Sequence, residues 1–181
     1  MARKLRPWYP GAIYHITARG NRRAPIFLGT HDYLRYLKIL EDVRETYPFI
    51  LHSYCLMTNH LHLQLETSEH HIQEIMKTIH SRYAKYLNLR LEVDGHVFQG
   101  RYGAKLILAD EYFLEVSRYI HRNPLEANMV KNPADYPWSS YSSYVHQSKN
   151  PHIDQTKTLS YFSEPAHIKY REFVEEEVEA N

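Results

Sequence analysis

Residues 60–66 read His60-Leu61-His62-Leu63-Gln64-Leu65-Glu66, an unbroken alternation of polar and apolar side chains. Successive side chains of a β-strand point to opposite faces, so the three leucines are expected to face a core while both histidines face the other way. Two imidazoles on one face of a rigid strand supply half of a metal site. An ordinary half-buried strand has the same pattern, so a metal site is predicted only if further ligands lie beside these histidines.

The segments around this strand predict an α+β fold. Residues 49–57 form an apolar strand that joins 60–66 through the turn Thr58-Asn59, so the two make a hairpin. Alternation predicts two more strands, over 13–19 and 104–108. Helical spacing predicts helices over 31–46, about 68–90 and from Asp110 to about Asn123. Thr30, Ser68 and Asp110 are the predicted caps of these helices, and Pro124 is predicted to end the last one. This order is that of a ferredoxin-like antiparallel sheet with helices on one face, followed by a third helix. The other face is expected to stay open to a substrate.

Length and composition narrow the class of protein. The chain has 181 residues, 43% of them hydrophobic and 24% charged, which is typical of one globular domain with an appendage. Its apolar runs are far shorter than the roughly 20 residues that span a bilayer. No export signal follows the basic start, so we expect a cytoplasmic protein with no membrane partner. The single cysteine, Cys55, excludes an intrachain disulfide and leaves histidine, carboxylate and amide groups as metal ligands.

The predicted third helix carries a second group of reactive side chains, in Tyr119-Ile120-His121-Arg122-Asn123. Tyr119 and Asn123 are four residues apart and therefore share one helical face. The amide oxygen of Asn123 can complete a nitrogen-and-oxygen site for a divalent cation, and the Tyr119 hydroxyl can attack a phosphate held there. A phenol with a pKa of about 10 needs a cation or a base to act as a nucleophile at neutral pH. His121 points elsewhere and is not a predicted ligand; for Tyr119, ordinary packing is the alternative.

Charge is unevenly distributed along the chain, although its net value is only +1. Residues 1–31 contain no Asp or Glu, and their basic residues are Arg3, Lys4, Arg6, Arg19, Arg22 and Arg23. A basic arm with interleaved aromatic side chains suits a nucleic-acid backbone, although a solvated basic terminus has the same composition. Residues 145–157 indicate a polar linker and 163–178 an acidic amphipathic helix, which we hypothesise to restrain the basic surface.

Five blocks of sequence, taken in order, resemble one known family. They are Tyr14-His15-Ile16-Thr17-Ala18-Arg19-Gly20-Asn21, Met57-Thr58-Asn59-His60-Leu61-His62, Gly95-His96-Val97-Phe98-Gln99-Gly100-Arg101-Tyr102, Tyr119-Ile120-His121-Arg122-Asn123-Pro124 and Tyr136-Pro137-Trp138-Ser139-Ser140-Tyr141. The pattern resembles the REP-associated tyrosine transposases, an IS200-like branch of the single-tyrosine HUH transposases. It runs from about Pro7 to Tyr144, so we expect a transposase domain over 1–144 and the linker with the acidic helix over 145–181.

One departure from this family follows Pro124. Family members commonly continue with a basic residue and a glycine, where this chain has Glu126 and Asn128. Because asparagine tolerates a left-handed backbone better than most residues, we expect the turn to persist.

The resemblance implies an enzyme that nicks single-stranded REP-type DNA hairpins and rejoins the strands. It implies that His60, His62 and Asn123 bind a divalent metal, Mg or Mn, and that Tyr119 is the nucleophile that forms a 5'-phosphotyrosine link. Candidate contacts to the DNA backbone are Arg19, Arg22, Arg23, Arg101 and Arg122. Two alternatives are a protein that binds such hairpins without cutting them and a metal-dependent hydrolase with no covalent tyrosine. Two histidines would also accept Zn, and the sequence fits a monomer or a homodimer.

Overall fold

The computed structural model describes residues 7–176 and contains a four-stranded antiparallel sheet. Its strands are β1 (Ile13–Arg19), β2 (Phe49–Leu56), β3 (His60–Thr67) and β4 (Gly103–Ile107), in the order β2-β3-β1-β4. Helix α1 (Thr30–Thr46) connects β1 to β2, and α2 (Ile72–Leu91) connects β3 to β4. This is the ferredoxin-like arrangement, so the α+β fold class predicted from the sequence is confirmed.

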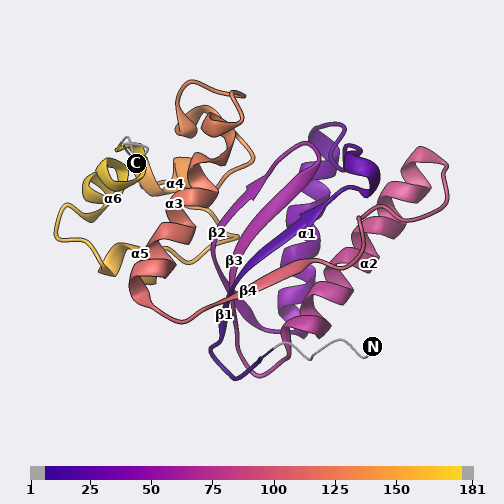
Figure 1. The fold of residues 1–181 in the computed structure, drawn as a ribbon, viewed down its shortest axis with the longest axis horizontal. Coiled ribbons are helices and arrows are strands. Elements are labelled where there is room, and N and C mark those ends of the chain that lie inside the picture. Colours follow the sequence, from indigo (N-terminus) through magenta and orange to yellow (C-terminus); the bar gives the residue numbers. More distant parts are fainter. Residues whose placement is uncertain (1–6, 177–181) are drawn as a thin grey trace.

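The main core lies between the sheet and the two helices α1 and α2, which Figure 1 shows on one side of the strands. Leu61, Leu63 and Leu65 of β3 are fully buried in it, as the alternation of this segment predicts. The neighbouring strand β1 adds Tyr14 and Ile16 to the same core. The polar residues of both strands consequently face away from α1 and α2.

The second face of the sheet is less open than expected, because α3 (Asp110–Glu126) packs across it. Phe113, Val116 and Ile120 of this helix form a smaller apolar cluster with β2 residues such as Cys55. The buried amide of Gln64 on β3 donates to the Phe113 carbonyl (2.8 Å), which ties the strand to the helix. Only part of this face therefore stays accessible.

The first two helices begin with caps other than those predicted. At α1 the buried Asp32 carboxylate, and not Thr30, accepts the backbone amides that precede the helix. At α2 the chain leaves β3 through four more residues before the helix starts, so that His71 replaces Ser68 as the cap and accepts the amide of Gln73 (2.9 Å). Both segments fold as helices because their apolar spacing, rather than the cap, fixes the buried face.

Both ends of α3 also differ by a few residues from the prediction. Asp110 is the first residue of the helix, and Ala109 occupies the cap position. Pro124 lies inside the last turn instead of ending it, since its fixed φ is helical and the Ala127 amide donates to the Asn123 carbonyl (3.0 Å). The turn that follows persists as expected, with Asn128 at a φ of 55°.

The remaining elements pack beyond α3, on the side away from α1 and α2 (Figure 1). They are the 3-10 helix η2 (Pro133–Asp135), α4 (Tyr141–Val145), α5 (Thr156–Ser160) and α6 (Ala166–Glu175). Residues 145–157, which indicate a linker in the sequence, lie against the edge strand β2, where the Asp154 amide donates to the Leu51 carbonyl (2.9 Å). The division of the chain at residue 144 stays a prediction. Helix α6 starts three residues later than 163, and the predicted end at Val178 lies outside the described residues.

No helix within residues 7–176 is long and apolar enough to cross a membrane.

A buried chain of hydrogen bonds fastens α3 to its neighbours. His121 is fully buried, with Nδ1 at 2.6 Å from the Tyr170 hydroxyl of α6 and Nε2 at 2.7 Å from the Ser140 hydroxyl. Tyr170 also bonds to Ser117 of α3 (2.6 Å), and Ser140 accepts the Tyr54 amide of β2 (2.9 Å). Every side chain in this series of hydrogen bonds has a partner, as buried polar groups generally do. His121 is therefore a structural residue, in agreement with its exclusion as a ligand.

Tyr170→Phe is expected to lower the free energy of unfolding by about 1–3 kcal/mol, because Ser117 and His121 stay buried and each loses a hydrogen-bond partner. Tyr161→Phe is the matched control, since it removes one exposed hydrogen bond to Asp110 and is expected to cost less than about 0.5 kcal/mol. Urea denaturation measures both values. Equal decreases in the free energy of unfolding of the two variants would show that the buried hydrogen bonds stabilise the fold no more than an exposed one.

Stability is expected to decrease as the pH falls below about 6.5. Burial lowers the pKa of His80 to about 4 and that of His121 to about 3, whereas an unfolded histidine titrates near 6.5. Between these values the unfolded chain binds more protons than the folded one, so the free energy of unfolding falls by up to about 1.4 kcal/mol per pH unit for each such group. His80→Phe should make this slope less steep between pH 6 and pH 4, because it removes one of these buried groups. Urea titrations at several pH values test this, and an unaltered slope in His80→Phe would contradict it.

Candidate active site

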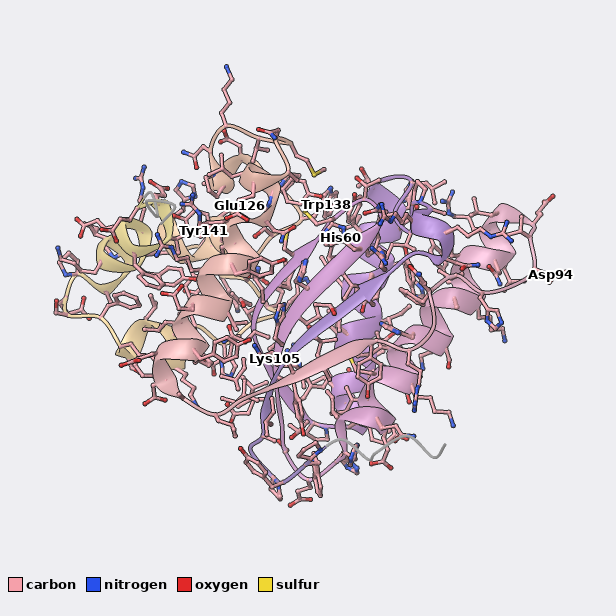
Figure 2. All side chains as sticks on the ribbon, in the orientation of Figure 1. His60, Asp94, Lys105, Glu126, Trp138 and Tyr141 are labelled. Carbon is pink, nitrogen blue, oxygen red and sulfur yellow. The ribbon has the colours of Figure 1, made fainter. Side chains whose placement is uncertain are left out.

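An open groove of ≈ 750 Å³ lies where β1 and β3 meet the hairpin turn, and Figure 2 shows His60 at this end of the sheet. Its lining comes from β1, β3, the segment before β4, and α3. The residues are Thr17, Ala18, Arg19, Arg23, Asn59, His60, Leu61, His62, Gln99, Arg101, Gly103 and Tyr119. Segments far apart in the sequence thus form one concave surface.

Two histidines, His60 and His62, line this groove, and a third, His15, lies behind His62. The register of β1 and β3 places Thr17 opposite His62, so that His15, two residues earlier on β1, lies diagonally from His62 on the same face. Nε2 of His15 is 3.1 Å from Nδ1 of His62, and the two rings stack with centroids 5.3 Å apart. The ring of His60 meets that of His62 edge to face at 5.2 Å.

Burial keeps these histidines in their neutral form. It lowers the pKa of His15 to about 4, with a smaller contribution from the charge of Lys105. It lowers the pKa of His62 to about 3, assisted by the two neighbouring histidines. For His60, burial is again the main cause of a lowered pKa, and the charge of Arg19 adds to the lowering. Asn123 acts in the opposite direction, because its Oδ1 can accept a hydrogen bond from Nε2 only when the ring is protonated. Neutral imidazole is the form that binds metal ions.

Helix α3 brings the predicted pair of side chains to the same groove. The ring of Tyr119 stands edge-on to His62 and His15, with centroids 5.3 and 5.7 Å apart, and the side chain is 44% exposed. Asn123, one turn later, is buried, and its Oδ1 lies 3.3 Å from Nε2 of His60. The helical spacing therefore survives the proline that follows Asn123.

Carboxylates and thiolates contribute no metal site here. Within residues 7–176, no group of three or more His, Cys, Asp or Glu side chains is arranged to hold a metal ion. A metal at His60 and His62 would therefore need a ligand of another type. The amide oxygen of Asn123 lies where such a ligand is required.

The charge of the groove is positive. Arg19, Arg23 and Arg101 line it, and none of the described residues in its lining is Asp or Glu. The guanidinium of Arg19 is held by Gln99, whose Oε1 accepts from Nε at 3.0 Å. Arg22 is exposed next to Arg23 but does not line the groove, and both residues have left-handed φ values of 53° and 62°.

Arg122 lies outside the groove. Its Nη1 donates to the carbonyls of Val174 (2.8 Å) and Glu176 (3.3 Å) at the end of α6, and Nε is 3.5 Å from Glu126. Its side chain is only 15% exposed. The structure thus uses this cation at the carboxyl end of a helix, where positive charge is favourable.

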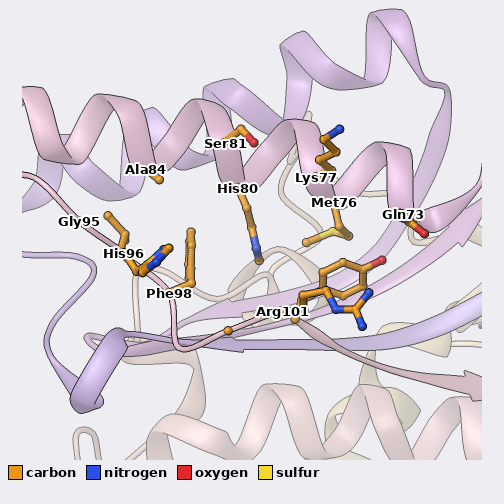
Figure 3. A pocket seen from close by; sticks show the side chains of 13 residues that line it. Gln73, Met76, Lys77, His80, Ser81, Ala84, Gly95, His96, Phe98 and Arg101 are labelled. Carbon is orange, nitrogen blue, oxygen red and sulfur yellow. The ribbon is translucent and has the colours of Figure 1, made fainter. Parts of the chain in front are cut away.

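A second, more apolar hollow of ≈ 350 Å³ lies between α2 and residues 95–102. Figure 3 shows His80 reaching down from α2 toward this segment, with its ring parallel to that of Phe98. Arg101 lines both hollows, so the two are neighbours.

Sequence reasoning missed three residues of the groove: His15 behind His62, Asn59 behind His60, and Gln99 behind Arg19. The alternation of 13–19 does place His15 on the polar face of its strand. Its contact with His62 depends on the pairing register of β1 and β3, which local sequence does not encode.

Comparisons with known proteins identify the family of the chain. Residues 9–123 match the family model described as "Transposase IS200 like". No curated protein matches the chain. Among solved structures, a REP-associated tyrosine transposase bound to a REP hairpin is similar, with a TM-score of 0.68 and 17% identity over 85% of this chain and 98% of that one. A putative transposase from Deinococcus radiodurans R1 has a TM-score of 0.46 and 17% identity, over 67% of this chain and 97% of that one. The family model covers most of the chain, including the groove, and the chain therefore belongs to the IS200-like transposase family.

Proposed function

We propose that this protein nicks and rejoins single-stranded DNA at REP-type hairpins through a 5'-phosphotyrosine intermediate on Tyr119. The observation that carries the proposal is the meeting of Tyr119, His60 and His62 in one basic groove, with the buried Asn123 beside His60. Hairpin DNA is proposed as the substrate because the solved structural relative is bound to a REP hairpin. The groove is open and lined by cations, as a bound single strand requires.

The side chains of the groove fit a divalent cation, Mg or Mn. Two neutral imidazoles and an amide oxygen are suitable donors, and His62 and Asn123 are buried, so their positions are restrained. His60 Nε2 and Asn123 Oδ1 are 3.3 Å apart, so that one ion could be held by both side chains. When bound, such an ion polarises the phosphate and offsets its developing negative charge.

Tyr119 supplies the nucleophile. Its hydroxyl oxygen forms a bond to phosphorus while the bond from phosphorus to the 3'-oxygen breaks, and the phenol proton is balanced by protonation of the leaving oxygen. The products are a phosphotyrosine on the 5' side and a free 3'-hydroxyl. Since the new ester retains the energy of the broken one, rejoining is the same step in reverse and needs no nucleotide cofactor.

Arg19, Arg23 and Arg101 hold the phosphates of the strand along the groove, and Arg22 extends this surface beside Arg23. Arg122 is not included in the proposed DNA contacts, because it is engaged by the end of α6.

The metal ligands can be tested by direct titration with Mn²⁺, followed by electron paramagnetic resonance of the free ion. His60→Ala and His62→Ala are each expected to weaken Mn²⁺ binding by more than about tenfold, because each removes a donor. His31→Ala, at an exposed histidine outside the groove, is expected to bind like the wild type. Undiminished Mn²⁺ binding by a folded double variant at 60 and 62 would rule out these ligands.

The nucleophile can be tested with Tyr119→Phe and labelled hairpin DNA in the presence of Mn²⁺ or Mg²⁺. The variant keeps the ring and loses only the hydroxyl, so it is expected to bind the hairpin normally and to form no covalent adduct on a denaturing gel. Tyr112→Phe, a half-buried tyrosine of the same helix beneath Lys105, is the matched control and should form the adduct.

Each other outcome of this experiment has a distinct meaning. An adduct that persists in Tyr119→Phe would contradict the assignment of the nucleophile. Cleavage without an adduct in the wild type would favour a hydrolase with no covalent tyrosine. Hairpin binding by the wild type with neither adduct nor cleavage would favour a protein that binds such hairpins without cutting them.

A further inference from the structure

The turn between β2 and β3 places a polar side chain directly behind a proposed metal ligand. Oδ1 of Asn59 lies 2.8 Å from Nδ1 of His60, the next residue, and Nδ2 of Asn59 donates to the backbone carbonyl of Arg23 (3.1 Å). Asn59 therefore connects His60 to the basic loop that carries Arg22 and Arg23.

The contact with Arg23 fixes which way the Asn59 amide points. A backbone carbonyl can only accept a hydrogen bond, so the NH₂ group must face Arg23 and the oxygen must face His60. That oxygen in turn can only accept, so Nδ1 of His60 must carry the proton. A neutral imidazole has one ring proton, and Nε2 of His60 is consequently left with a free lone pair.

The free lone pair points at the proposed metal position. Nε2 of His60 faces Oδ1 of Asn123 at 3.3 Å, so two electron-pair donors meet with no proton between them. A cation held by His60 and Asn123 would replace this unfavourable contact with a favourable interaction for each atom.

The support behind Asn59 is rigid. The Gly20 amide donates to the Asn59 carbonyl (2.8 Å), and the Arg23 amide donates to the Gly20 carbonyl (3.0 Å), so the loop and the turn are clasped together. Gly20 permits this approach, because a Cβ at that position would lie 2.0 Å from the Ala24 carbonyl oxygen. The carbonyl that orients Asn59 thus has little freedom to move.

We propose that Asn59 is a positioning residue that fixes the tautomer and the ring orientation of His60, so that Nε2 is presented to the metal. The inference rests on the metal site of the proposed function and adds to it the group that prepares the ligand. It assigns to the Arg23 carbonyl, and hence to the basic loop, a part in shaping the metal site.

The test reads the tautomer without any metal. Protein with ¹⁵N-labelled histidine is studied by long-range ¹H–¹⁵N correlation NMR, which identifies the protonated ring nitrogen of His60, and Mn²⁺ affinity is then measured on the same samples. The variants are Asn59→Ala, which removes both hydrogen bonds, and Asn59→Asp, which keeps an acceptor for Nδ1. The matched control is Asn88→Ala, because Asn88 also donates to a backbone carbonyl, that of Gly95, away from the groove.

We expect the wild type and Asn88→Ala to carry the His60 proton on Nδ1 alone. Asn59→Ala should show both tautomers and bind Mn²⁺ about tenfold more weakly or worse, and Asn59→Asp should restore the single tautomer and the affinity. A wild-type proton on Nε2, or an Asn59→Ala protein with unchanged tautomer and unchanged Mn²⁺ affinity, would overturn the inference. A failure of the metal site itself looks different: the wild type would then show the Nδ1 tautomer and bind no Mn²⁺.

Discussion

The direction in which β3 faces governs the whole site. The leucines of β3 are buried against α1 and α2; they are Leu61, Leu63 and Leu65. Because side chains alternate along a strand, His60 and His62 must then lie on the opposite face of the sheet. A slip of one residue would place both imidazoles in the apolar core and expose three leucines, which costs far more than any contact made by the histidines themselves. The hydrophobic effect on one side of the sheet therefore orients the polar chemistry on the other.

Helix α3 turns this polar face into a groove. The helix covers Gln64 of β3 and the β2 side of the face, including Cys55, and leaves accessible the part over β1 and the start of β3. Helical spacing then divides the work between two side chains: Asn123 is buried beside His60, while Tyr119 is 44% exposed over His62. A nucleophile must be accessible to a substrate, whereas a metal ligand must have a restrained position. The spacing of one helical turn meets both requirements, because it exposes Tyr119 and buries Asn123.

The parts of the molecule that could be predicted from sequence are those set by local periodicity. Alternation gave the strand 13–19 with its observed bounds, and the spacing of Tyr119 and Asn123 placed them on one face. The helix caps were wrong at Thr30 and Ser68, because α1 begins at Thr30 itself with the Asp32 carboxylate bonded to the preceding amides, and α2 begins only after His71. The contact of His15 with His62, that of Asn59 with Arg23 and the position of Arg122 could not be predicted. Each depends on a pairing between segments that are far apart in the sequence, which no local window contains.

The hydrogen bond between His121 and Tyr170 also has a consequence for synthesis on the ribosome. The two residues are 49 positions apart, and α3 cannot satisfy its buried polar groups until α6 has been made. The sheet and its two histidines can assemble from the earlier part of the chain, since domains form as their residues emerge. The helix that carries Tyr119 can pack on the sheet before then through Phe113, Val116 and Ile120, but its buried hydroxyl and imidazole gain their partner only once α6 has been made. The last contacts of this helix therefore form after the sheet that it covers.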